Sequence, residues 1–245
     1  MPERFAIYYA PGHGSPLDRL GSSWLGRCAL TGTFQQQPLV PGFNADQLDR
    51  LTTSPRRYGF HATLVPPFSL RQECSPEDLL EQTRILARQL AAVKLRPLTV
   101  TALGSFLALV PSRQDEVSRL AETCLRALHP LREPPSLREM ERRRVRGLTP
   151  VQERLLRQWG YPYVLGEYTF HMTLTGSIGN HATRKTLARQ LTKYFQPIRK
   201  VEHVIDELCL FRQQDEHSPF LLFHRVPMGS LQGGTLQGGT CEQAP

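Results

Sequence analysis

The sequence predicts an α+β fold with two pseudo-symmetric lobes, each carrying an antiparallel sheet, around a central cleft. A seven-residue pattern, Tyr-x-Phe-His-x-Thr-Leu, occurs at residues 58–64 and again at 168–174. The strands and helices expected around each copy follow a similar order in both halves of the chain, as an internal duplication would produce. We therefore expect one bilobal domain over residues 1–228, with lobes at about 1–104 and 105–228 and a helical insertion at about 131–160.

Apolar runs bounded by glycine or proline predict the strands, and capped stretches with a helical apolar stripe predict the helices. The expected strands comprise residues 5–10, 58–64, 98–101, 106–110, 168–174, 201–211 and 219–226. The expected helices comprise residues 44–53, 75–93, 112–128, 149–160 and 180–195. Ser75-Pro76-Glu77-Asp78 is the clearest helix start, because serine caps, proline suits the first turn and acids suit the positive end of the dipole. Residues 11–43 read as a long connection, and Pro66-Pro67 is expected to end the first motif strand.

Composition limits the partners that the chain could take. The net charge is +8 and the isoelectric point is about 9.6, which favours anionic partners such as small phosphorylated molecules or RNA. Five widely spaced cysteines without a Cys-x-x-Cys pair indicate neither a disulfide framework nor a zinc site. No stretch approaches membrane-spanning length, so a cytoplasmic protein without a membrane partner is expected. The glycine-rich residues 229–245, which repeat Leu-Gln-Gly-Gly-Thr, are expected to be disordered.

The two motif copies carry the candidate catalytic residues. Read as strands, they place His61 and Thr63, and likewise His171 and Thr173, on one face, with apolar residues behind. Two other His-x-Ser/Thr sequences, at residues 13–15 and 181–183, lie in a turn and at a helix start and are read as chance matches. The alternative for the pair is a duplicated domain in which two core histidines are merely hydrogen-bonded.

Two imidazoles facing one cleft suit acid–base chemistry on a phosphodiester, since one can accept a proton while the other donates one. The hydroxyls of Thr63 and Thr173 would then donate hydrogen bonds to phosphoryl oxygens, and no metal or cofactor is needed. Arg57 is a candidate anion contact, although a surface arginine at a strand entrance is an equal alternative. The run Arg142-Arg143-Arg144 could bind phosphate or form the solvated side of an inserted helix, and we favour the solvated side.

The two motifs resemble those of the two-histidine phosphoesterase superfamily, which includes RNA 2′,3′-cyclic phosphodiesterases and RNA 2′-5′ ligase-like proteins. Over residues 4–226 the chain more narrowly resembles a family encoded with phosphonate-degradation (carbon–phosphorus lyase) genes. That similarity rests on the two motifs and on three further stretches: Trp24-Leu25-Gly26-Arg27, Arg142-Arg143-Arg144 and residues 159–164. One departure is Val65, at a position where that family often has lysine.

The resemblance implies a bilobal α+β fold and the roles of His61, Thr63, His171 and Thr173. The expected activity is metal-independent hydrolysis of a small cyclic or linear phosphodiester, such as a phosphonate-pathway or ribose-phosphate intermediate. RNA end processing and non-catalytic RNA or nucleotide binding remain alternatives. The substrate, the oligomeric state and the assignment of base and acid stay open.

Overall fold

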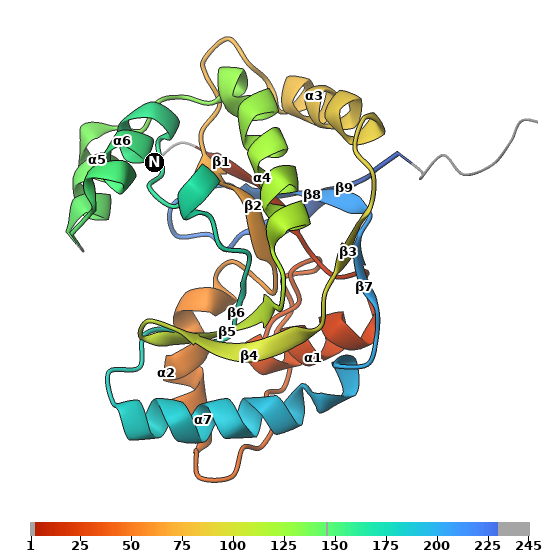
Figure 1. Ribbon diagram of the computed structural model, residues 1–245, viewed down its shortest axis with the longest axis vertical. Helices are drawn as coiled ribbons and strands as arrows, with labels where there is room; N and C mark the ends of the chain where they lie inside the picture. The colour runs from red at the N-terminus through yellow and green to blue at the C-terminus, as the bar shows by residue number, and fades with distance from the viewer. Residues whose placement is uncertain (1–2, 146, 230–245) are drawn as a thin grey trace, which may run out of the picture.

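The structure, a computed structural model, describes residues 3–145 and 147–229 (Figure 1). Its strands are β1 (Arg4–Tyr9), β2 (Ala62–Phe68), β3 (Val93–Leu95), β4 (Leu98–Leu103), β5 (Phe106–Pro111), β6 (Met172–Thr173), β7 (His203–Ile205), β8 (Glu207–Gln213) and β9 (Leu221–Pro227). Its α-helices are α1 (Pro16–Leu25), α2 (Ala45–Arg56), α3 (Pro76–Arg88), α4 (Asp115–Leu128), α5 (Leu137–Arg144), α6 (Pro150–Trp159) and α7 (His181–Tyr194). Helices and antiparallel strands occur together, so the α+β class is confirmed. No helix in the described ranges is long and apolar enough to cross a bilayer.

Seven strands form one sheet in the order β4-β5-β6-β2-β1-β8-β9, and β3 pairs separately with β7. The two motif strands, β2 and β6, are therefore neighbours at the centre of the large sheet. They pair antiparallel through Ala62 and Met172, the residues directly after the two histidines. Because β6 has only two residues, this central junction is narrow, whereas the ladders on either side of it are longer.

Packing of the helices crosses the two halves of the chain. Helix α4 packs against β2 and α3, and helix α7 packs against β4 and β5. Figure 1 shows these two groups above and below the central junction, with α1 and α2 in the lower group. Helices from the second half of the chain thus cover strands from the first half. The expected lobe limits near residue 104 and the internal duplication stay predictions.

The sheet separates two apolar clusters of unequal size. Phe5, Ile7 and Tyr9 of β1 face the main core, which the helices cover. Ala6 and Tyr8 face a smaller cluster that also contains Phe211 and Phe220. The alternation of β1 thus supplies both faces of the sheet, and the smaller cluster lies on the side where the candidate site is found.

The connection at residues 11–43 contains a helix, α1, that the sequence reading missed. Ser15 caps it, accepting a hydrogen bond from the Asp18 N–H at 3.2 Å, and Pro16 occupies the first turn. Gly21 lies inside this helix and obscures its apolar stripe. A Cβ at Gly21 would lie 2.0 Å from the Phe60 ring, so glycine allows α1 to pack directly on the first motif.

Several other boundaries differ from expectation, among them the second motif strand, which was expected over residues 168–174 and comprises only Met172–Thr173. Strand β2 continues through Pro66 and Pro67 to Phe68, α3 ends at Arg88, α2 extends to Arg56, and the run 201–211 divides into β7 and β8. Gly229, expected to belong to the tail, pairs with Ala91, and its N–H bonds to the Ala87 carbonyl at 2.9 Å. The rest of the expected disordered tail, residues 230–245, lies outside the described residues.

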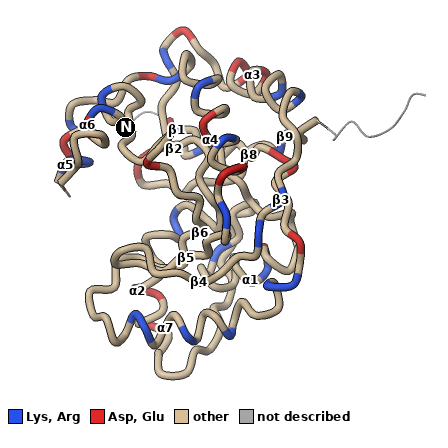
Figure 2. The backbone as a smooth tube through the Cα atoms, viewed as in Figure 1, with Lys and Arg blue, Asp and Glu red and all other residues tan. Residues whose placement is uncertain are grey.

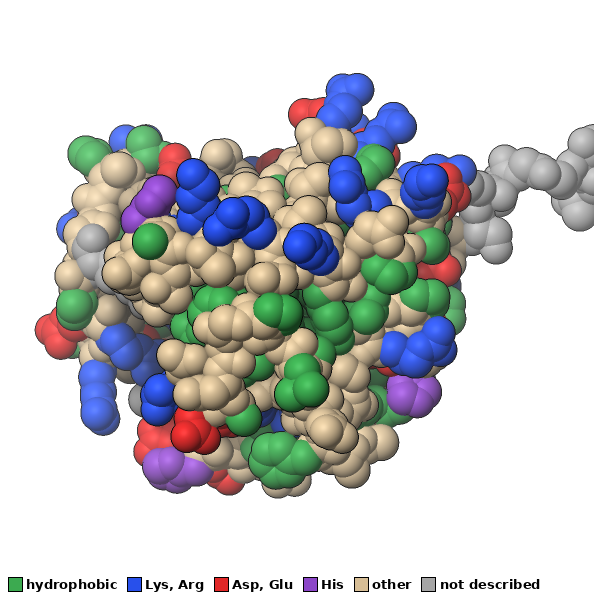
Figure 3. Space-filling view, turned by 90° about the horizontal axis from the view of Figure 1, so that it is seen from below, with side chains coloured by type: hydrophobic (Ala, Val, Ile, Leu, Met, Phe, Trp, Pro, Cys, Tyr) green, Lys and Arg blue, Asp and Glu red, His purple; other side chains and the backbone are tan. Residues whose placement is uncertain are grey.

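The charged side chains are spread unevenly. Figure 2 shows basic and acidic residues together on the insertion helices α5 and α6, which lie beside the N-terminal end of the described chain. Seen from below, Lys and Arg side chains outnumber acidic ones and surround an apolar area (Figure 3). This distribution agrees with the net charge of +8.

Candidate active site

The first motif places His61 immediately before β2 and Thr63 on that strand. The Thr63 hydroxyl lies 3.4 Å from the His61 Nε2 atom, so both side chains share one face. Phe60, Ala62 and Leu64 are buried behind them in the main core. The expected alternation therefore holds from residue 60 to residue 64.

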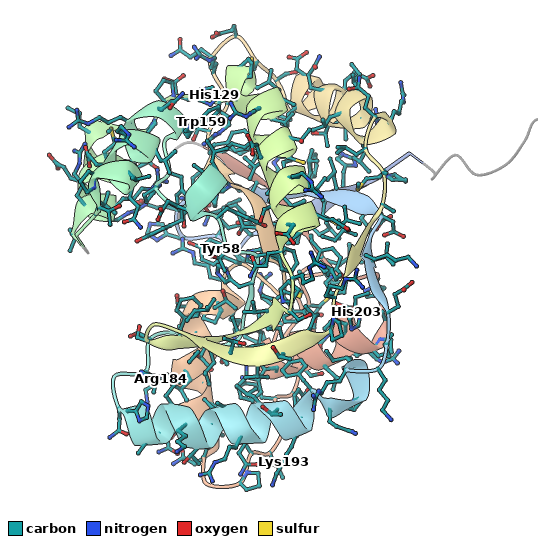
Figure 4. The ribbon with its side chains drawn as sticks, viewed as in Figure 1. Tyr58, His129, Trp159, Arg184, Lys193 and His203 are labelled. Carbon is teal, nitrogen blue, oxygen red and sulfur yellow. The ribbon has the colours of Figure 1, made fainter. Side chains whose placement is uncertain are left out.

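Residues 58–60 are a turn, not the strand that we expected. Gly59 has a φ of +76°, and a Cβ there would lie 2.6 Å from the Cβ of Ala29. This left-handed residue turns Tyr58 away from the main core, so that its ring lies 6.1 Å from the His61 ring, near the middle of the molecule (Figure 4). Tyr58 thus belongs to the wall of the site.

Both histidines are held by the same local hydrogen bond. His61 Nδ1 lies 2.9 Å from the Gly59 carbonyl oxygen, and His171 Nδ1 lies 2.8 Å from the Thr169 carbonyl oxygen. A carbonyl oxygen can only accept, so each Nδ1 carries the proton that it donates. In each neutral ring Nε2 is therefore an acceptor, which is the atom that a general base needs, and in His61 it accepts from the Thr63 hydroxyl at 3.4 Å.

The fold brings the two histidines together, as the sequence predicted. The antiparallel pairing of Ala62 with Met172 brings the two motifs together, with His61 and His171 on either side of that pair, and the two imidazoles are close enough to interact electrostatically. Tyr168 of the second motif adds a direct link, because its hydroxyl donates to the Thr63 carbonyl at 2.8 Å. Thr173 lies on β6 opposite Ala108 of β5. The four motif residues thus line one region of the sheet.

The surroundings of the two rings differ. Tyr8 stacks on His61 with ring centroids 3.9 Å apart, while the nearest recorded aromatic ring to His171 is Phe106, at 5.6 Å. Burial lowers the pKa of His61 to about 4, and the nearby His171 and Arg27 lower it further against the opposing effect of the Gly59 carbonyl. Burial also lowers the pKa of His171, which its hydrogen bond to Thr169 partly opposes. His61 is consequently the ring that is harder to protonate.

Arg57 does not lie on the motif strand. Its backbone is helical, at the C-terminal end of α2, and the residue is exposed, so Arg57 does not share a strand face with His61. A role in substrate binding stays a prediction. The arginine beside His61 is Arg27, which is only 4% exposed and donates to the carbonyls of Arg56, Arg57 and Phe220. It belongs to the stretch Trp24-Leu25-Gly26-Arg27, which the sequence singled out without indicating this position.

The structure also places Trp24 and the basic run at residues 142–144, two further features of the sequence. The Trp24 indole donates to the Leu174 carbonyl at 2.7 Å, so it packs α1 against the second motif. In the basic run of α5, Arg144 forms an ion pair with Glu153 and Arg142 is exposed, as expected for a solvated helix face. Arg143 instead turns inward and donates to the Gly160 carbonyl.

No group of three or more His, Cys, Asp or Glu side chains within residues 3–145 and 147–229 is arranged to hold a metal ion. The expectations of metal-independent and cofactor-independent chemistry stay predictions.

Comparison with known proteins gives a family and two named relatives. Residues 63–221 match the family described as "Protein of unknown function (DUF1045)". The chain is 38% identical over 229 residues to a ribose 1,5-bisphosphate phosphokinase PhnN of Janthinobacterium sp. (strain Marseille), covering 91% of this chain and 50% of that protein. It is 35% identical over 228 residues to the protein of the same name from Laribacter hongkongensis (strain HLHK9), covering 91% of this chain and 51% of that protein.

The chain therefore spans about half the length of the curated relatives that it matches. Among solved structures, Kluyveromyces marxianus Usb1 with uridine monophosphate aligns with 11% identity and a TM-score of 0.40, over 90% of this chain and 98% of that one. The family match extends from the first motif strand to β9 and includes the second motif. On this basis the chain belongs to the DUF1045 family.

Proposed function

We propose that the protein is a metal-independent phosphoesterase that hydrolyses a small cyclic or linear phosphodiester. The observation that carries the proposal is the matched pair of histidines. Each donates its Nδ1–H to the carbonyl two residues earlier, so that Nε2 is the proton-accepting atom, which in His61 lies 3.4 Å from the Thr63 hydroxyl. Two oriented imidazoles in one site are suited to general base and general acid roles in a single displacement.

In the proposed reaction His61 is the base and His171 is the acid. Neutral His61 accepts a proton at Nε2 from a water molecule, whose oxygen attacks phosphorus. The bond from phosphorus to the leaving ester oxygen breaks, and that oxygen takes the proton from Nε2 of protonated His171. The lower pKa of His61 supports this assignment, because the base must be neutral and the acid protonated in the same molecule.

The threonine hydroxyls stabilise the charge that develops on phosphorus. Thr63 and Thr173 lie on the two central strands and face the same side as the histidines. Their hydroxyls would donate to the non-bridging oxygens, whose charge increases in the transition state.

The relatives' names support a sugar phosphate as the substrate. Both are ribose 1,5-bisphosphate phosphokinases, and this chain corresponds to about half of each. A phosphodiesterase acting beside such a kinase would open a cyclic or linear diester of a ribose phosphate, in phosphonate metabolism or a related route. RNA end processing, or RNA binding without catalysis, is the second candidate, and the net charge of +8 favours it.

The test is hydrolysis of a panel of cyclic and linear phosphodiesters followed by phosphorus NMR with saturating EDTA. The panel should contain ribose cyclic phosphates, nucleoside 2′,3′-cyclic phosphates and short RNAs with a cyclic end. Turnover of a small diester that persists in EDTA and disappears in His61→Ala is the expected result. Loss of turnover in EDTA with recovery on adding a divalent ion would refute the metal-independent reaction.

The salt dependence of binding distinguishes RNA binding, the second candidate, from hydrolysis of a small diester. A long RNA that neutralises many phosphates should lose affinity steeply as salt increases, while a small diester should show a shallow slope. Tight, strongly salt-dependent RNA binding without turnover of any diester would favour the non-catalytic alternative.

A further inference from the structure

Two arginines beside the candidate site have no carboxylate partner. Arg4, on β1, donates from Nε to the Gln213 side-chain oxygen at 2.8 Å, and its guanidinium carbon lies 5.4 Å from the Phe220 ring centroid. Arg143, on α5, donates to the Gly160 carbonyl, and its guanidinium carbon lies 5.2 Å from the Tyr161 ring centroid. Their contacts are thus neutral oxygens and aromatic faces.

Two neighbouring arginines are paired with acids. Arg144 forms an ion pair with Glu153, and Arg212, on the strand beside β1, forms one with Glu3. Within the described part of the chain, neither Arg4 nor Arg143 has such a partner. Neutral acceptors hold a guanidinium in position without cancelling its charge, so both remain available to an anion.

The two guanidiniums are also close enough to repel each other. Burial lowers the pKa of Arg143, with Arg142 and Arg4 lowering it further, while Glu139 and Tyr161 oppose this effect. The Glu139 carboxylate caps its own helix by accepting from Ser136, so it does not bridge the arginines.

A third arginine adds positive charge behind Arg143. Arg132 is 6% exposed, and its Nε and one terminal nitrogen have no hydrogen-bond partner among the described residues. It lies close enough to Arg143 for the two charges to interact. Arg4, Arg132 and Arg143 therefore gather positive charge between α5 and the N-terminal strand, where Glu139 is the acid whose charge acts on Arg143.

Aromatic rings connect this positive region to the histidines. Arg4 lies over Phe220, on which Tyr58 stacks at 5.2 Å between ring centroids. Tyr58 and Tyr8 both contact the His61 ring. Two aromatic rings thus separate the Arg4 guanidinium from His61 by this route, and Figure 1 shows α5 and α6 near the N-terminal end of the described chain.

We propose that Arg4 and Arg143 bind a phosphate monoester group of the same substrate whose diester lies between His61 and His171. This inference rests on the proposed function and narrows its substrate class. The substrate would be a sugar that carries a cyclic or linear phosphodiester and, at a separate position, a phosphate monoester. Two guanidinium forks match the three oxygens of a monoester dianion, and the tyrosine rings supply a wall for the sugar.

Binding of ribose 5-phosphate, measured by calorimetry, tests the subsite without requiring turnover. The wild-type protein should bind it, while Arg4→Met and Arg143→Met should each weaken binding by about 10- to 100-fold. Arg142→Met is the matched control, since it removes an exposed charge from the same helix and should change binding less than about threefold. Thermal melts should show that every variant is folded, and Arg143→Lys provides a milder change at the position that packs on Tyr161.

A substrate pair tests the link to catalysis. Adenosine 2′,3′-cyclic phosphate and its 5′-phosphorylated form differ by one monoester, and the wild-type ratio of their kcat/KM values should favour the phosphorylated form by about 10-fold or more. Arg143→Met should bring this ratio close to one, and Arg142→Met should preserve it. Equal binding of ribose 5-phosphate by the wild type, Arg4→Met and Arg143→Met would overturn the subsite. If binding depends on the arginines but no diester is hydrolysed, the subsite stands and the proposed function fails.

Discussion

The pH dependence of kcat/KM follows directly from the unequal environments of the two histidines. His61 must be neutral to act as the base, and burial under Tyr8 holds its pKa at about 4. His171 must be protonated to act as the acid, and burial places its pKa below the usual value of 6.5. Activity should therefore increase as pH rises through about 4 and decrease as pH rises through the pKa of His171, which gives a bell with its maximum on the acid side of neutrality.

The size of the effect is set by these limits. At pH values above the pKa of His171, each further pH unit lowers kcat/KM about tenfold. Activity at pH 7.5 should therefore be about one tenth of the maximum or less. Initial rates on the diester found in the panel, measured from pH 3.5 to 8.5, would give the two macroscopic values of the pair. Saturating EDTA should change neither the height nor the shape of the bell.

Proton NMR of the imidazole Cε1–H signals assigns the two limbs of the pH profile to His61 and His171. In the free protein His61 should titrate at a lower pH than His171, with His61→Asn and His171→Asn identifying the signals. The reverse order would exchange the roles of base and acid. A profile that is flat between pH 5 and 8, or a maximum above pH 7 in the free-enzyme parameter, would contradict the two-histidine reasoning itself.

Three further predictions concern single features of the chain. His61→Ala and His171→Ala should each lower kcat by about 10²–10⁴ without changing the circular dichroism spectrum, and near-wild-type turnover in either would exclude an acid–base pair. Gly59→Ala should reduce the free energy of unfolding by about 1–3 kcal/mol, because Gly59 has a φ of +76° and no room for a methyl group, whereas Gly12→Ala, with nothing within 4 Å, should be nearly neutral in the same urea titration. Deletion of residues 230–245 should leave the melting temperature and activity unchanged, since that segment has almost no apolar side chain, and a marked fall in melting temperature would contradict this.

Local sequence signals predicted that the two motifs come together in the fold, while the catalytic and binding roles of their residues stay predictions. The repeated motif identified both histidines and both threonines, and the structure places the two motif strands side by side. The predicted alternation of buried and less buried side chains is observed in residues 60–64, because that segment enters a sheet with a buried face. The cap at Ser75 also marked the start of α3 correctly, since capping depends on only four neighbouring residues.

Features that depend on distant contacts could not be predicted in the same way. Arg27 reaches the site because it bonds to the carbonyls of Arg56, Arg57 and Phe220, which are 29 to 193 residues away in the chain. Gly21 falls in the stretch that the sequence predicted to be a connection, although it lies at a close contact between α1 and the Phe60 ring. In both cases a tertiary contact decides the role of a residue whose local sequence is uninformative.

The two motifs also show how equal sequences acquire unequal roles. Each histidine donates its Nδ1–H to the carbonyl two residues earlier, so the motif itself fixes the ring orientation and makes Nε2 the proton acceptor in both copies. The difference comes from neighbours outside the motif: Tyr8 covers His61, while the aromatic ring recorded nearest to His171, Phe106, is farther from it. Exchange of base and acid would therefore require changes around the motifs, at positions such as Tyr8, and not in the motifs themselves. Replacing Tyr8 with leucine should raise the pKa of His61 by exposing it and move the acid limb of the bell toward neutral pH, with no direct effect on His171.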